Sequence, residues 1–527
     1  MKRIVILIAV LTHLIYLSSF AQGYEIKVKV RGVNPKQPLY LGHHFNEKLI
    51  PDDTVIVDSK GWATFTGLKP LPGGMYFIFL PSRSYFDFLV DKQQRFIIEN
   101  DTLNLLQNLK FTNSPENTVF NEFQKFMVSM QKKAKELQEE RAKYSSDPAK
   151  AKEIEAKLIQ IDADYQAYVT KVLETNNDMF FTKFIKATRD VSIPKHITDD
   201  FQKYLYYKAH YWDNFDVSDA RLLRTPIYEN KIMFYLDKVS SQVPDSLNKE
   251  VDYLIEKSRS SQELFRYMLV SLFNKYAGSQ IMSAENVYVH IADKYYIKEA
   301  DWSEADFLKD LKERVRKKKN CLIDGKAKDM KLQTLFSDTL QINMLEDMLP
   351  DFKKKGLDIE KDSIKLGKEK MLNQKAIILD EYMSNFKGYM SLHQTKSKFT
   401  ILWFWDPTCS HCMVETPKLH TAWRDTLKAK GVNVIAVFLH KDLDQWDKFV
   451  KNLDDWYKFI KKNKLNDWTN AWSPFDPFRE NYDISSSPVL FLLDENLKII
   501  AKRVGYEQAK EIIEGILENE EQMKKKK

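Results

Sequence analysis

Two cysteines lie three positions apart in the segment Cys409-Ser410-His411-Cys412, which follows an apolar run closely. The run Phe399–Trp405 predicts a strand that is covered on both faces, and the residues after Cys409 predict a helix. A helix N-terminus favours a thiolate through its dipole and its unpaired backbone N–H groups. The spacing therefore predicts a redox dithiol in which Cys409 attacks a substrate disulfide and Cys412 resolves the mixed disulfide.

Two other uses of these cysteines fit the sequence less well. A structural zinc site normally needs four ligands, and the chain has no second Cys-x-x-Cys or His-x₃₋₅-His pair to supply them. A thiol peroxidase would carry proline and a hydroxyl residue seven and three positions before its reactive cysteine. Leu402 and Asp406 occupy those positions before Cys409. We therefore expect no metal and no cofactor beyond a redox-active Cys409–Cys412 disulfide.

Cysteine is otherwise scarce, with only 3 in 527 residues. Three cysteines cannot staple so long a chain, so a disulfide scaffold is excluded. The third one, Cys321, lies 88 residues before Cys409 and follows three lysines, Lys317 to Lys319, that would favour its thiolate if it were exposed. Three interpretations stay open for Cys321: an inert buried thiol, a link between two copies of the chain, or a site for mixed disulfides.

The composition is that of a multidomain globular protein. Hydrophobic residues make up 43% and charged residues 29%, and the length suggests about three or four folding units. Glycine and proline are few, at 15 and 17, which favours long helices. The net charge is only +7, with the two signs interspersed. We read the basic blocks 314–319 and 524–527 as solvated faces and expect no nucleic-acid partner.

The N-terminus predicts a secretory signal peptide over residues 1–21. Lys2 and Arg3 precede an apolar run that is short for a membrane span, and small residues flank a cut before Gln22. An uncleaved anchor is the alternative. No later stretch of the sequence is apolar enough to span a bilayer, so we expect no integral membrane span after cleavage, and a location outside the cytosol.

Residues 22–112 predict an antiparallel β-sandwich. Apolar and charged residues alternate from Tyr24 onward, and short strand-like runs are separated by turn signals such as Asn34-Pro35 and Lys60-Gly61. We find no catalytic constellation in this region. His43 and His44 are neighbours, whose side chains point to opposite faces of a strand.

Residues 113–318 predict an α-helical domain, because the apolar period changes to that of a helix. Two long apolar stripes flank Ser145-Ser146-Asp147-Pro148, which predicts a helical hairpin with Asp147 as the cap and Pro148 at the first helical position. Further helices are expected around 201–211, 251–276 and 284–296.

Residues 319–520 predict an α/β domain, followed by a basic tail at 521–527. The expected order is β-α-β-α-β-β-α, a parallel sheet that ends in an antiparallel hairpin, which is the order of thioredoxin. A lysine-rich insertion at about 350–393 would interrupt the domain.

The active-site segment resembles the signature of TlpA/ResA-type extracytoplasmic thiol:disulfide oxidoreductases. Residues 404–417 read FWDPTCSHCMVETP, and Trp446 and the turn Ser487-Pro488-Val489 add to the resemblance. It covers residues 399–515, about a fifth of the chain. The regions before it loosely resemble accessory domains that are fused to such modules in Gram-negative envelope proteins.

The resemblance implies roles for several residues. Pro488 matches a cis-proline that faces the dithiol, which would leave the backbone of Ser487 free to pair with an extended substrate. The resemblance also assigns Trp405, which lies within the signature, to substrate binding together with Ser487 and Pro488. Glu415 matches an acidic residue near the buried cysteine, where a carboxylate can tune the thiols or take a proton. A solvated surface glutamate is the alternative.

The chain departs from the family pattern at two positions. Trp403 stands where cytosolic thioredoxins have a buried acid, so Glu415 would carry proton transfer alone. His411 lies between the cysteines, where an imidazolium would stabilise the Cys409 thiolate, unless its side chain points to solvent. With the imidazolium, we expect a reduction potential between those of thioredoxin and DsbA, at about −270 to −120 mV.

The sequence thus predicts a disulfide oxidoreductase of the Gram-negative periplasm or cell envelope. We expect it to reduce protein or peptide disulfides and to be kept reduced by a membrane electron donor. The alternative is an envelope binding or scaffold protein in which the N-terminal domains do the main work and the redox domain is auxiliary.

Overall fold

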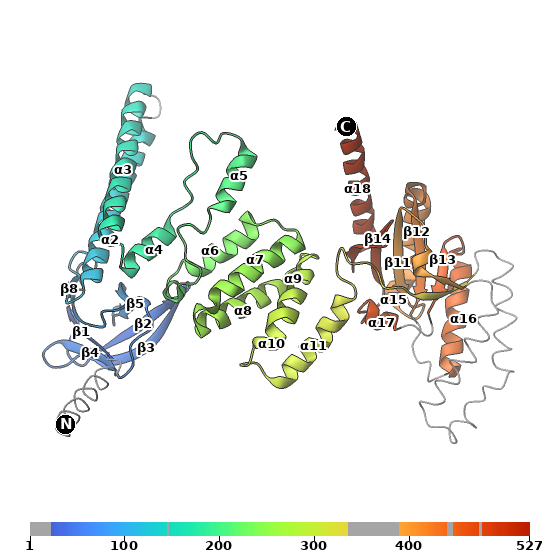
Figure 1. Ribbon diagram of the computed structural model, residues 1–527, viewed down its shortest axis with the longest axis horizontal. Coiled ribbons are helices and arrows are strands. Elements are labelled where there is room, and N and C mark those ends of the chain that lie inside the picture. The colour runs from blue at the N-terminus through green and yellow to red at the C-terminus, as the bar shows by residue number, and fades with distance from the viewer. Residues whose placement is uncertain (1–22, 145–146, 336–388, 440–445, 474–476, 527) are drawn as a thin grey trace, which may run out of the picture. The chain divides into compact units, whose positions relative to one another are not determined.

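The computed structural model describes residues 23–144, 147–335, 389–439, 446–473 and 477–526 (Figure 1). The predicted signal peptide and most of the predicted insertion lie outside these residues. The chain divides into two compact units, residues 1–268 and 269–527. The domain boundaries predicted from the sequence stay predictions. In the described parts of the chain, helices are too short or too polar to cross a membrane.

The first unit begins with two four-stranded sheets, ordered β4-β1-β7-β8 and β3-β2-β5-β6. Apolar side chains from both sheets, among them Val28, Phe65, Phe88 and Ile98, form one buried cluster. The strands are β1 (Tyr24–Arg31), β2 (Pro38–Phe45), β3 (Lys48–Ile56), β4 (Trp62–Gly67), β5 (Gly74–Phe79), β6 (Tyr85–Val90), β7 (Arg95–Asp101) and β8 (Lys110–Thr112).

The prediction that these strands are all antiparallel was wrong. β1 and β7 run parallel, with Val28 opposite Ile98. Alternation of apolar and polar residues identifies a strand and its buried face, but it carries no information on which strand lies beside it. The two histidines of β2 bind different carboxylates, since His43 contacts Asp52 and His44 contacts Asp87, each at 2.8 Å.

Helices make up the rest of the first unit. A long hairpin is formed by α2 (Pro115–Lys143) and α3 (Pro148–Thr175), which lie side by side in Figure 1. The Asp147 side chain accepts hydrogen bonds from the backbone N–H groups of Ala149 and Lys150 and so caps α3, as predicted. The following helices are α4 (Phe180–Thr188), α5 (Asp200–Ala209), α6 (Tyr228–Phe234) and α7 (Pro244–Lys257), and the next helix, α8 (Gln262–Ala277), contains the division between the two units.

The helix predicted around 251–276 is two helices. A 3₁₀ turn at Ser258–Ser260 separates α7 from α8. The buried Ser258 hydroxyl donates to the carbonyl of Ile255 at 2.7 Å. Serine competes in this way with the backbone hydrogen bonds of a helix. A hydrophobic period alone does not show such a break.

The second unit contains the last helices of the helical region and a seven-stranded sheet, ordered β10-β9-β13-β12-β11-β14-β15. The helices are α9 (Ala284–Ile291), α10 (Ile297–Glu299) and α11 (Ala305–Lys319). The strands are β9 (Lys331–Leu335), β10 (Tyr389–Ser391), β11 (Phe399–Trp405), β12 (Val432–Phe438), β13 (Thr469–Trp472), β14 (Val489–Asp494) and β15 (Ile499–Lys502).

The predicted strand order lacked β9 and β10 at its start and, within it, β13. This strand runs parallel to β12, with Ala471 opposite Val437, so the β-α-β-α-β-β-α prediction was incomplete. Its four residues include the polar Thr469 and Asn470, which hides the apolar pattern of a buried strand. Residues 389–393, which were assigned to the insertion, belong to the sheet through β10 and the turn after it.

Helices pack on both faces of this sheet, as the continuous apolar run of β11 predicts. Ile401 and Trp403 belong to the buried cluster on one face, and Leu402 and Phe404 belong to the cluster on the other. The helices beside the sheet are α15 (Ser410–Ala422), α16 (Trp446–Lys462), α17 (Phe478–Asn481) and α18 (Tyr506–Lys526) (Figure 1).

One buried hydrogen bond fixes α15 against β11. The indole N–H of Trp403 donates to the Thr416 hydroxyl at 3.0 Å, and both side chains are buried. The buried indole N–H of Trp403 therefore has a partner in α15.

We expect Thr416→Val to loosen α15, because the substitution keeps the shape of the side chain and leaves the buried Trp403 N–H without an acceptor. Such a loss costs about 1–3 kcal/mol. Hydrogen exchange of the reduced protein measures this loss as faster exchange of the backbone amides of α15. The control is Thr421→Val on the exposed face of the same helix, where the hydroxyl donates to the Pro417 carbonyl. Equal exchange in both variants would contradict the assignment.

Candidate active site

The two cysteines lie at the start of α15 in different environments. Cys409 is the N-cap residue and is half-buried, whereas Cys412 lies one turn into the helix and is fully buried. The Cys409 sulfur accepts a hydrogen bond from the backbone N–H of Cys412 at 3.4 Å. Both cysteines are present as free thiols. This is the arrangement that the Cys-x-x-C spacing predicts at a helix N-terminus.

The turn before the dithiol is built by Asp406. Its buried carboxylate accepts hydrogen bonds from the backbone N–H and the hydroxyl of Thr408, at 2.8 and 2.6 Å. The Asp406 carbonyl accepts from the Cys409 N–H at 3.1 Å. Asp406 therefore positions the reactive cysteine. We did not predict this role of Asp406 from the sequence, although Asp-Pro followed by a hydroxyl residue is a recognisable turn signal.

The segment before β14 faces the dithiol. The Ser487–Pro488 peptide bond is cis. The Ser487 carbonyl accepts a hydrogen bond from the Cys409 thiol at 3.4 Å. The structure thus places Ser487 and Pro488 beside Cys409, although they lie far from it in the sequence.

The surroundings push the pKa values of the two thiols apart. Burial by itself would raise the pKa of Cys409, but hydrogen bonds from the Cys412 thiol and from the Cys412 and His411 N–H groups hold it below the ordinary value. Burial raises the pKa of Cys412 to about 12, and the neighbouring Cys409 adds to the rise. The site therefore favours the thiolate of Cys409 more than water does and keeps the Cys412 thiol protonated at neutral pH.

The other residues predicted for the site lie in different settings. The side chain of His411 is exposed, and its backbone N–H is the group that favours the Cys409 thiolate. Glu415 forms an ion pair with Lys418 at 2.9 Å on the helix surface. Trp405 is fully buried and packs on Phe459, with ring centres 5.2 Å apart, so it presents no surface to a substrate in this structure.

The described residues show no cluster of three or more His, Cys, Asp or Glu side chains that could hold a metal ion.

Two family matches cover most of the chain after residue 122. Residues 123–320 match a family described as a domain of unknown function (DUF5106), and residues 397–499 match a family described as thioredoxin-like. The first match covers most of the helical region, and the second begins just before β11 and contains the dithiol. No curated protein matches the chain.

Three of the solved structures similar to the chain come from Cytophaga and Bacteroides species. A domain of a possible thiol-disulfide isomerase from Cytophaga hutchinsonii is 37% identical, with 26% of this chain and 85% of that chain covered and a TM-score of 0.22. The thioredoxin domain of a thiol-disulfide oxidoreductase from Bacteroides vulgatus is 27% identical, with 24% and 89% covered and a TM-score of 0.20. A thioredoxin-like protein from Bacteroides caccae is 17% identical, with 62% and 97% covered and a TM-score of 0.36.

The thioredoxin-like match and the dithiol at the start of α15 concern the same segment. The chain therefore contains a thioredoxin-like domain over residues 397–499.

Proposed function

We propose that the protein is an extracytoplasmic thiol:disulfide oxidoreductase of the TlpA/ResA type that reduces disulfides in proteins or peptides. The observation that carries this proposal is the difference between the two thiols. Cys409 is half-exposed and its pKa is lowered, while Cys412 is buried and its pKa is raised. A thiolate that a substrate can reach, next to a protected thiol, is what reduction through a mixed disulfide needs.

The reaction proceeds by two exchanges of sulfur partners. The Cys409 thiolate attacks one sulfur of the substrate disulfide, the substrate S–S bond breaks, and the other substrate sulfur leaves as a thiolate. Cys412 then loses its proton to that thiolate and attacks the Cys409 sulfur. The Cys409–Cys412 disulfide forms and the second substrate sulfur leaves, so two electrons pass from the protein to the substrate.

The backbone around Ser487 gives the substrate a place to bind. Its carbonyl lies within 3.4 Å of the Cys409 sulfur, and an extended peptide can pair with exposed backbone groups of this kind. A dithiol donor in the membrane would return two electrons to the oxidised protein. The signal peptide predicted over residues 1–21 supports a location in the periplasm or cell envelope of a Gram-negative bacterium.

We expect the two cysteine variants to fail in different ways. Cys409→Ser abolishes reduction of insulin disulfides, because it removes the attacking thiolate. Cys412→Ser instead accumulates a mixed disulfide with the substrate, because the resolving thiol is absent. Electrophoresis without reductant measures the trapped species. Cys321→Ser is the matched control and keeps wild-type turnover. Full turnover in both active-site variants would show that the dithiol is not catalytic.

The lowered pKa of Cys409 predicts the pH dependence of its reactivity. A thiolate is alkylated and a thiol is not, so the rate falls as the pH drops below the pKa of the attacking thiol. A free cysteine has a pKa of about 8.5. The pH at which iodoacetamide modifies Cys409 at half its maximal rate should therefore lie below that value. Cys412 should stay unmodified over the same range. Mass spectrometry of the reduced protein identifies the modified residue, and a Cys409 midpoint at or above the free value would contradict the account.

A further inference from the structure

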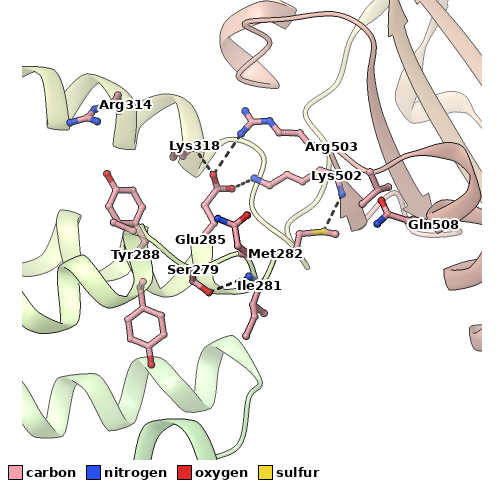
Figure 2. Close-up of a pocket in the computed structure, with 14 residues that line it drawn as sticks. Ser279, Ile281, Met282, Glu285, Tyr288, Arg314, Lys318, Lys502, Arg503 and Gln508 are labelled. Atoms are coloured by element: carbon pink, nitrogen blue, oxygen red, sulfur yellow. Dashed lines mark hydrogen bonds and ion pairs between the residues drawn. The ribbon is translucent and has the colours of Figure 1, made fainter. Parts of the chain in front are cut away.

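A cavity of about 710 Å³ lies in the second unit, between the segment that leads into α9 and the turn from β15 to α18 (Figure 2). Most of its charged lining groups are basic. The basic groups are Arg314 and Lys318 from α11 and Lys502 and Arg503 from the end of β15. Among the described residues of the lining, the one acidic group is the carboxylate of Glu285 from α9. We call this cavity the basic pocket.

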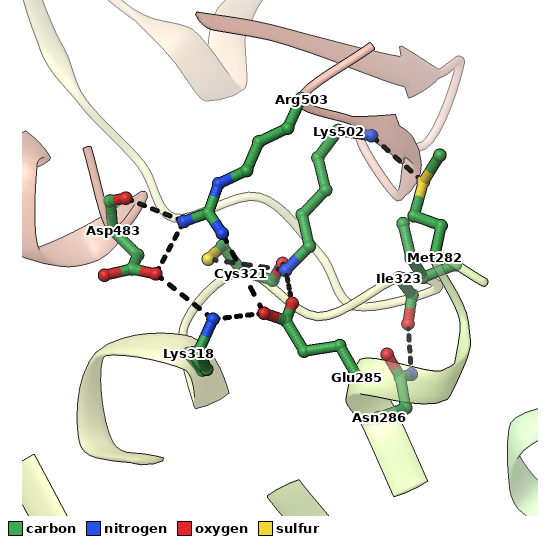
Figure 3. Close-up of polar contacts among 9 residues, drawn as sticks. All are labelled: Met282, Glu285, Asn286, Lys318, Cys321, Ile323, Asp483, Lys502 and Arg503. Atoms are coloured by element: carbon green, nitrogen blue, oxygen red, sulfur yellow. Dashed lines mark hydrogen bonds and ion pairs between the residues drawn. The ribbon is translucent and has the colours of Figure 1, made fainter. Parts of the chain in front are cut away.

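Two carboxylates hold three of these cations in place. Glu285 forms ion pairs with Lys318 and Lys502 (Figure 3). Asp483, from the segment after α17, binds Arg503 at 2.5 Å and Lys318 at 3.5 Å. Burial by itself would raise the pKa of Glu285, but Lys502 and Lys318 hold it below the ordinary value, so Glu285 stays ionised.

The fourth cation leaves the pocket with an excess of positive charge. Arg314 is exposed and lies over the Phe307 ring, 5.9 Å from its centre, and none of the ion pairs among the described residues includes it. Four cations against two carboxylates leave two positive charges in excess. The basic block that begins at Arg314, interpreted above as a solvated face, therefore places part of its charge in this pocket.

Three of the four cations of the basic pocket, Lys318, Lys502 and Arg503, are held by ion pairs before any ligand binds. The Lys502 side chain is only 4% exposed, and its amino group also donates to the Cys321 carbonyl at 2.7 Å. Its backbone N–H contacts the Met282 sulfur at 3.2 Å. A site whose side chains are already ordered loses little conformational entropy on binding.

The basic pocket is connected to the dithiol along one edge of the sheet. The Arg503 N–H donates to the Leu490 carbonyl at 2.7 Å, and Leu490 lies two residues after Pro488. β14 separates β15 from β11, the strand that leads to Cys409. Leu490 lies opposite Trp403, two residues before the end of β11. Two strand spacings across the sheet, about 10 Å, and two residues along the strand, about 7 Å, combine to about 12 Å, a distance that about four residues of extended chain span. A peptide bound at Cys409 can therefore extend to the pocket.

We propose that the basic pocket binds the acidic flank of a protein substrate whose disulfide lies at Cys409. The carboxylates that it recognises lie roughly three to five positions from the substrate cysteine. Arginine pairs with carboxylates through two parallel hydrogen bonds, which makes Arg314 the residue most suited to contact them. This inference rests on the proposed function for its substrate, but the binding itself needs no redox chemistry.

The test measures binding without chemistry. A fluorescently labelled peptide that carries several glutamates and no cysteine is titrated with the full reduced chain, and a peptide with glutamines in their place is the reference. We expect the acidic peptide to bind more tightly, and added salt to weaken it. Arg314→Ala should weaken binding of the acidic peptide about five-fold, the loss expected for one exposed ion pair. Lys312→Ala removes an exposed charge from the same helix and should change nothing.

Two results would overturn the proposal. One is equal affinity for the two peptides, or equal loss in the Arg314 and Lys312 variants. The other is an Arg314-dependent affinity for inorganic phosphate above that for the acidic peptide, which would assign the pocket to small anions. A second arm compares reduction of matched disulfide peptides, where Arg314→Ala should lower the preference for the acidic one. Absence of any reduction, with binding intact, would count against the proposed function and leave the pocket assigned.

Discussion

The arrangement of the active site depends on the sulfur of Cys409 at the N-terminus of α15. Backbone N–H groups from the first turn of the helix point at this sulfur and favour its negative charge. A thiolate gains from such groups only if they are held in place. The strand β11 supplies that support, because it is buried on both faces and the Trp403–Thr416 hydrogen bond ties it to the helix.

The same support makes the two thiols unequal. The first turn of α15 turns Cys412 into the apolar cluster under the helix, where burial keeps it protonated, and leaves Cys409 at the surface. The segment at Ser487 closes the site from the other side and offers a carbonyl next to the reactive sulfur. Nucleophile, resolving thiol and a backbone group for the substrate thus follow from one helix packed on one sheet.

The sequence predicted the parts of this site that depend on local pattern. The Cys-x-x-C spacing, the apolar run of β11 and the Asp147-Pro148 cap are local signals, and the structure has the expected elements at each. The sequence pattern did not predict the direction in which side chains near the cysteines point. His411 and Glu415 are close to the cysteines in sequence, but the ring of His411 is exposed and Glu415 pairs with Lys418. The parallel pairing of β1 with β7 was equally hidden, because strand partners are set by tertiary packing.

The central claim is that Cys409 and Cys412 form one reversible redox couple and that Cys321 takes no part in it. Equilibration of the full chain in glutathione buffers, followed by acid quench and mass spectrometry, tests this claim directly. The account predicts that Cys409 and Cys412 lose their thiols together, at a single midpoint, while Cys321 stays reduced. A disulfide that involves Cys321, or loss of one active-site thiol without the other, would contradict it.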